Sequence, residues 1–140
     1  MLLRLRGMNT PRPRLRWLLL ALLSLWTVAL LALAVVLTTD SYGGMQGVPL
    51  LIAAGNVFAA IPFVTPVGPR LVLLGRAIAV VQGLAVAATG YLLTGAAASI
   101  TSMGYNVDPG FSPFTVITAL AGLALVILSL VAPPAPAPTP

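Results

Sequence analysis

Three polar side chains inside otherwise apolar segments are the residues of this chain most able to do chemistry. Asn56 and Gln82 both lie near the middle of long apolar runs. A carboxamide surrounded by hydrocarbon needs a hydrogen-bond partner. We therefore predict an intramembrane polar contact in which Asn56 and Gln82 face each other or share a bound water. Such a contact would either hold helices together or form part of a ligand or ion path.

The third polar side chain, Arg76, is the one charge placed inside an apolar run, six residues after Arg70. An arginine this close to the end of a membrane span ordinarily extends its guanidinium to the headgroup region. A sharper hypothesis is that Arg76 and Arg70 contact an anionic lipid headgroup. The apolar runs contain no acid, so a salt bridge to Arg76 would need a partner from another chain.

The two acidic residues lie in polar segments between apolar runs, and each is followed or preceded closely by a tyrosine: Asp40 with Tyr42, and Asp108 with Tyr105. If both segments met, these four residues could form the active site of a membrane enzyme, although acids in loops are usually just solvated. The chain has no cysteine and no histidine. This excludes disulfides and thiol catalysis, and it removes the usual metal, haem and proton-shuttle ligand. We therefore predict no cofactor, no bound metal and no enzymatic activity.

Small residues recur every fourth position in the third apolar run, at Gly75, Ala79, Gly83 and Ala87. This spacing lets two helix backbones approach closely, and such packing drives helix association in lipid. The sequence predicts a helix-packing seam here, either against another span of the same chain or between two copies of it. Packing within the chain is the preferred interpretation.

The elements that position these residues are predicted to be four membrane spans. Of the 140 residues 59% are hydrophobic and only 6% are charged, far from the composition of a soluble domain. The fold class is all-α: a polytopic integral membrane protein with an antiparallel four-transmembrane-helix bundle. A basic segment (1–16) precedes the membrane domain (17–132), and a Pro/Ala-rich tail (133–140) follows it. The predicted spans are 17–37, 48–64, 70–93 and 113–132.

The first and third spans leave alternatives open. The first has a length of about 31 Å, which matches the hydrocarbon thickness. A cleaved signal peptide is the competing interpretation, but the apolar run is long for one. Met8 is an alternative start to Met1. The third span is the longest and could extend to Ala98, so we expect it to tilt or to project from the bilayer. Ser112 and Pro113 are expected to cap and begin the fourth span.

Basic and acidic residues alternate between the segments that precede or connect the apolar runs. Five of the seven arginines precede the first run, and the other two lie at the junction of the second and third runs. One acid lies between the first and second runs, and the other lies between the third and fourth. The positive-inside rule then places the N- and C-termini in the cytoplasm, in a multi-pass protein of the inner (plasma) membrane. Its partners are the bilayer and anionic headgroups at the cytoplasmic face, with no nucleic acid. The use of arginine without lysine, and the abundance of Ala, Gly and Pro, favour a GC-rich bacterial genome.

Function is the least determined property. The leading hypothesis is a non-catalytic accessory or structural membrane subunit, acting with a membrane protein partner or as a homo-oligomer. The second is an oligomeric channel or carrier for a neutral or lipidic substrate, and a membrane enzyme using the acids of the outer loops is third. A polar cavity holding both Asn56 and Gln82 would favour transport, whereas an exposed face carrying Gly75 and Gly83 would favour a partner.

Overall fold

The computed structural model describes residues 13–39, 46–106 and 111–138, which form four helices and no strand. They are α1 (Pro13–Thr39), α2 (Gly47–Val64), α3 (Pro69–Ser102) and α4 (Phe111–Val131). Each is long and apolar enough to cross a membrane. The predicted all-α, four-span fold class is therefore confirmed, and the chain has the helices of a multi-pass membrane protein.

Prolines set most of the helix boundaries. Pro69 opens α3, where a missing N–H costs nothing because first-turn amides have no partner within the helix. Pro49 lies in the first turn of α2 for the same reason. At the other end of α2 both the amide and the hydroxyl of Thr65 donate to the carbonyl of Ile61, at 2.9 and 3.1 Å. Pro66 follows, so the chain leaves the helix there.

The helix that contains the third span, α3, continues to Ser102, beyond residues 93 and 98 predicted for the end of the span. Its 34 residues give a length of about 51 Å, well beyond the hydrocarbon thickness. The stop signal is Gly104, which has a φ of +85°. The amides of Gly104 and Tyr105 donate back to the carbonyls of Thr101 and Ile100, the pattern of a Schellman cap. The helix therefore continues past the fall in hydropathy after residue 93, as expected for an element that tilts or projects from the bilayer.

The fourth helix also differs at its start. α4 begins at Phe111, so Ser112 lies within the first turn and is not the residue that precedes the helix. Its carbonyl accepts a hydrogen bond from the hydroxyl of Thr115 at 2.9 Å. The other bounds differ from the prediction by a few residues at most, except that α1 begins four residues earlier, at Pro13.

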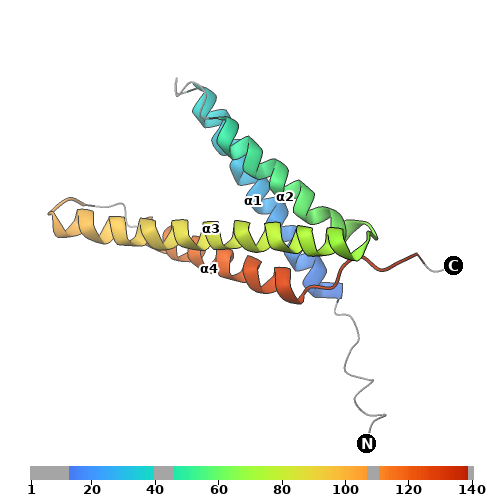
Figure 1. Cartoon of the computed structure of the whole chain (residues 1–140). Helices are drawn as coiled ribbons and strands as arrows, with labels where there is room; N and C mark the ends of the chain where they lie inside the picture. The colour runs from blue at the N-terminus through green and yellow to red at the C-terminus, as the bar shows by residue number, and fades with distance from the viewer. Residues whose placement is uncertain (1–12, 40–45, 107–110, 139–140) are drawn as a thin grey trace, which may run out of the picture.

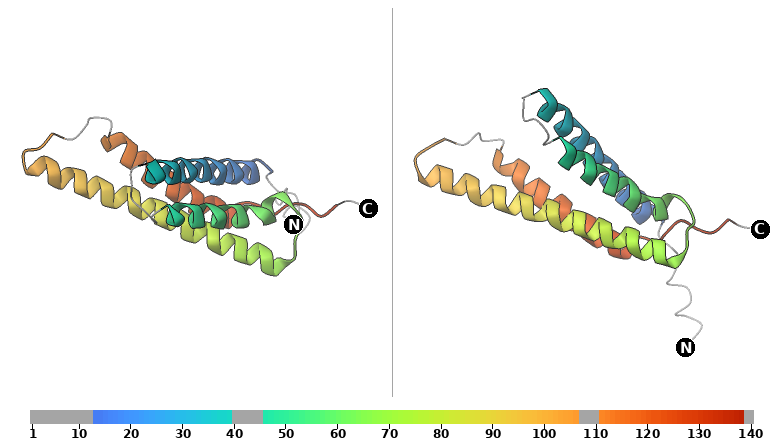
Figure 2. Two further views of the ribbon diagram at one scale, coloured as in Figure 1. Left: turned by 90° about the horizontal axis from the view of Figure 1, so that it is seen from above. Right: turned by 45° about the horizontal axis from the view of Figure 1, so that its top comes forward.

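The helices form two antiparallel hairpins that diverge from a common end (Figure 1). The α1–α2 hairpin and the α3–α4 hairpin meet where α1 begins, where α2 turns into α3 and where α4 ends. We call this the arginine end, since Arg14, Arg16 and Arg70 lie there. Toward the opposite end the two hairpins separate, as the views in Figure 2 show. The contact between α3 and α4 is the most extensive, and that between α1 and α4 is the least.

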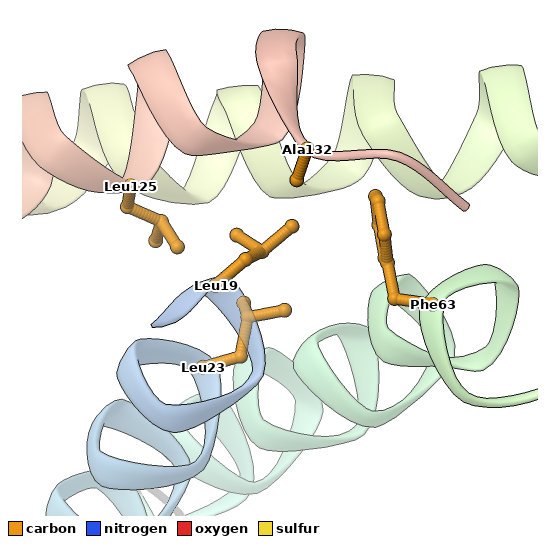
Figure 3. Close-up of a cluster of buried hydrophobic side chains, with 5 residues drawn as sticks. All are labelled: Leu19, Leu23, Phe63, Leu125 and Ala132. Atoms are coloured by element: carbon orange, nitrogen blue, oxygen red, sulfur yellow. The ribbon is translucent and has the colours of Figure 1, made fainter. Parts of the chain in front are cut away.

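The apolar core of the molecule lies at the arginine end (Figure 3). Leu19 and Leu23 of α1 pack there with Phe63 of α2, Leu125 of α4 and Ala132, and all five are almost fully buried. Beyond this cluster little of each span is covered by the rest of the chain. Only 22% of the residues in the most apolar stretch of α1, α3 and α4 are buried, and 33% in α2. The lipid-facing and inter-hairpin surfaces therefore dominate the molecule.

Candidate functional site

Arg76 joins α3 to the end of α4. Its guanidinium donates hydrogen bonds to the carbonyls of Ser129 at 3.2 Å, Leu130 at 2.5 Å and Ala132 at 2.7 Å. Its charged carbon also lies 5.9 Å from the centre of the Phe63 ring, within the range of a cation–π contact. The geometry differs from the free extension toward headgroups that we expected as the default. Arg70, in contrast, is exposed at the start of α3.

The prolines of the tail explain why these carbonyls need an outside donor. In a continuing helix each would accept from the amide four residues later, but positions 133, 134 and 136 are all proline. The carbonyls of residues 129, 130 and 132 therefore have no such donor. A guanidinium supplies several N–H groups in a rigid fork, and its positive charge suits the negative end of a helix. Arg76 thus serves as the C-terminal cap of α4.

The same logic fixes the start of the tail. The carbonyl of Pro62 in α2 has no helical donor, because the residue four positions later is Pro66. The amide of Ala135 donates to this carbonyl at 2.9 Å. The tail was predicted to be extended or disordered, and residues 133–138 do lack helix and strand. Its first residues nonetheless cross the end of α2, and Ala132 is completely buried.

The small-residue seam of α3 lies within the chain and is divided between two neighbours. A Cβ added at Gly75 would meet the ring of Pro62 in α2 at 2.6 Å. A Cβ added at Gly83 would lie 2.8 Å from the side chain of Val126 in α4. Ala79 is fully buried and Ala87 lies against Gly122 of α4. Neither glycine is exposed, so the α3 stripe offers no free surface for a partner.

Gln82 of α3 and Asn56 of α2 make no hydrogen bond with each other. The amide nitrogen of Gln82 donates to the carbonyl of Ile52 at 3.4 Å, a long hydrogen bond. A Cβ at Gly55 would lie 3.1 Å from the same nitrogen, so residue 55 faces α3. The next residue along a helix is turned by about 100°, which takes Asn56 away from α3. The structure therefore does not bring the two amides together, and the predicted direct contact between them is not made.

Asn56 itself is buried without a partner. Only 1% of its surface is exposed. Neither its side-chain oxygen nor its nitrogen has a hydrogen-bond partner among the described residues. It borders a cavity of about 280 Å³ between α1 and α2, which Ser24 and Thr27 of α1 also line. A buried carboxamide with both polar atoms unsatisfied is rare in native structures and requires an explanation.

A second cavity lies between the hairpins, where α1 and α4 diverge. It measures about 230 Å³ and is almost wholly apolar. Its lining comes from three helices: Leu22, Leu25, Trp26, Ala29, Val86, Phe114, Ile117, Thr118, Ala121 and Leu125. The indole nitrogen of Trp26 is buried and has no partner within the described part of the chain. We call this opening the α1–α4 cleft.

Several contributors to helix packing lie outside the predicted seam. Gly90 and Gly122 are as closely packed as the predicted seam, since an added Cβ at Gly90 would lie 2.5 Å from the backbone of Ala119. The hydroxyl of Thr94 donates to that of Thr115 at 2.9 Å and links α3 to α4. The four-residue spacing from Gly83 does not reach Gly90, which lies seven residues on, so a seven-residue period would have been needed to find it.

The loop residues of the enzyme hypothesis are tested least. Asp40, Tyr42 and Asp108 lie outside the described residues, and Tyr105 is 68% exposed just after α3.

Comparison with protein-family models, with curated proteins and with solved structures finds no match to this chain. Its function must therefore be argued from its own geometry.

Proposed function

We propose that the chain is a non-catalytic accessory subunit of a membrane complex, and that its α1–α4 cleft receives a transmembrane helix of another protein. The observation that carries this proposal is the divergence of the two hairpins from the arginine end. One face of α4, with Phe114, Ile117 and Ala121, and one face of α1, with Leu25 and Ala29, border the resulting opening. These spacings of three and four residues are those of a single helix face.

Two properties of the cleft favour a helix over disordered lipid chains. Tight van der Waals packing is what drives helix association in lipid, and the cleft presents large side chains that are still uncovered. Leu25 is 68% exposed and Ile117 is 65% exposed. A buried indole N–H usually has a hydrogen-bond acceptor, which hydrocarbon cannot supply to Trp26. A partner helix with a polar side chain at that depth would provide it.

The use of the polar groups inside the chain also supports a structural role. Arg76 bonds the end of α4, Gln82 bonds the backbone of α2, and Thr94 joins α3 to α4. Other intramembrane hydroxyls, such as those of Thr27 and Ser129, donate to carbonyls of their own helices. These groups hold the fold together, so we assign the function to the apolar surface.

Cross-linking from the cleft tests this proposal cleanly, because the chain has no native cysteine. A photoreactive maleimide would be attached to Ile117→Cys in native membranes, with Leu123→Cys as the control on an exposed, outward face of the same helix. We expect a discrete protein adduct from residue 117 and only lipid adducts from residue 123. Equal lipid adducts at both positions would refute the proposal. An adduct of two copies of this chain would replace the foreign partner with a homodimer.

We also propose that the arginine end faces the cytoplasm of a bacterial inner membrane. The placement of all the arginines at one side of the spans supports this orientation. A reporter that is active only in the cytoplasm should be active when it is fused after Pro140. A periplasmic readout would reverse the topology.

A further inference from the structure

The cavity beside Asn56 has the features of a binding site that is separate from the α1–α4 cleft. Asn56 is 1% exposed, and both polar atoms of its carboxamide lack a partner among the described residues. A carboxamide offers an acceptor oxygen and a donor NH2 group, and in Asn56 both are covered by neighbouring side chains. Leaving both unsatisfied at membrane depth is costly, so a ligand that satisfies them would gain the full strength of these bonds.

The surroundings of Asn56 define which ligand chemistry fits. The cavity of about 280 Å³ is lined by apolar side chains of α1 and α2 and by the two hydroxyl residues Ser24 and Thr27. The hydroxyl of Thr27 already donates to the carbonyl of Leu23 at 2.7 Å. None of the residues that line the cavity is charged. An ionised ligand would find no counter-charge, so an uncharged group is favoured.

A second opening lies farther along the same side of the α1–α2 hairpin. It measures about 220 Å³ and is bordered by Leu31 and Val35 of α1 and Leu50 of α2. Leu50 lies two helical turns from Val57, which borders the Asn56 cavity, so both are on one face of α2. The two openings lie along one mostly apolar groove, with Asn56 at one end and Thr38 and Gln46 at the other. We call it the α1–α2 groove.

We propose that the α1–α2 groove binds an uncharged, lipid-soluble molecule that carries a hydroxyl or carboxamide group. The polar group of the ligand both donates to and accepts from the carboxamide of Asn56. Its apolar body lies along the groove toward Leu31 and Leu50. Binding requires a small displacement of the side chains over Asn56, because the two amide atoms are covered in the unliganded chain. This site is independent of the partner proposed for the α1–α4 cleft.

Solution NMR of the full chain in detergent micelles tests this site directly. The chain contains three asparagines, Asn9, Asn56 and Asn106, so selective ¹⁵N-asparagine labelling gives three pairs of side-chain amide signals. The probes are 1-dodecanol and, as the matched control without a hydroxyl, dodecane. We expect dodecanol to shift the Asn56 signal saturably while dodecane leaves it unchanged. No shift with dodecanol, or the same shift with dodecane, would overturn the proposal.

Two variants separate ligand binding from a purely structural role of Asn56. Val57→Trp should fill the cavity and abolish the shift with dodecanol, whereas Leu51→Trp, on another exposed face of α2, should leave it intact. Equal effects of the two tryptophans would contradict the site. If Thr27→Val moves the Asn56 signal in the absence of dodecanol, the amide is satisfied by that hydroxyl and the groove has no free amide to offer.

Discussion

Replacing Arg76 should release the end of α4, and the structure allows the loss to be sized. The two short hydrogen bonds, to Leu130 at 2.5 Å and Ala132 at 2.7 Å, come from one charged group. Each hydrogen bond to a charged group contributes about 1.5–3 kcal/mol. Bonds made by one side chain do not add fully, so we expect Arg76→Leu to lower the free energy of unfolding by about 3 kcal/mol. On the scaling known for soluble domains of this size, the melting temperature would fall by about 10 °C.

The control is Arg70→Leu, which removes the same charge from the same helix at an exposed position. It should change the melting temperature by a degree or two at most, since isolated surface charges contribute about 0–1 kcal/mol. Arg76→Lys retains the charge near the helix end but loses the fork, and we expect it to recover about 1 kcal/mol. The assay is thermal unfolding in mild detergent, followed by size-exclusion chromatography and circular dichroism. If Arg76→Leu and Arg70→Leu have the same melting temperature, the cap contributes nothing to stability and the reasoning fails.

Three further substitutions test the packing, the tail and the orphan amide by the same unfolding assay. Gly122→Ala should destabilise by about 2 kcal/mol because the added methyl meets the backbone of α3, whereas Gly95→Ala, with nothing within 4 Å, should be neutral or stabilising. Equal effects would contradict the close approach of α3 and α4. Ala135→Pro removes the amide that bonds α2 and should cost about 1 kcal/mol, while Ala137→Pro should be silent. Asn56→Leu should raise the stability by about 1–3 kcal/mol, because it removes a buried polar group without a partner. A loss of stability in Asn56→Leu would show that the amide already has a hydrogen-bond partner.

The apolar runs of the sequence determined the number, order and approximate bounds of the helices. A helix is the structure that satisfies its own backbone in hydrocarbon, so run length and composition are enough to identify it. Proline positions determined the turn after α2 and the non-helical tail, because a proline removes a donor wherever it stands. The end of the helix α3 could not be predicted in the same way. Hydropathy reports where the membrane ends, whereas a helix ends at its cap, here Gly104.

The tertiary structure alone decided what the polar side chains contact. The sequence places Asn56 and Gln82 at similar depths in the membrane, but depth does not fix the rotation of a helix. Each residue turns the helix by about 100°, which separates the side of α2 that faces α1 from the side that faces α3. The partners of Arg76 lie more than fifty residues away, at carbonyls whose lack of a donor is visible in the sequence but whose position is not. The close approach of the α3 and α4 backbones at their glycines is likewise visible only in the structure. Local sequence therefore fixes the helices, and packing fixes the groove and the cleft between them.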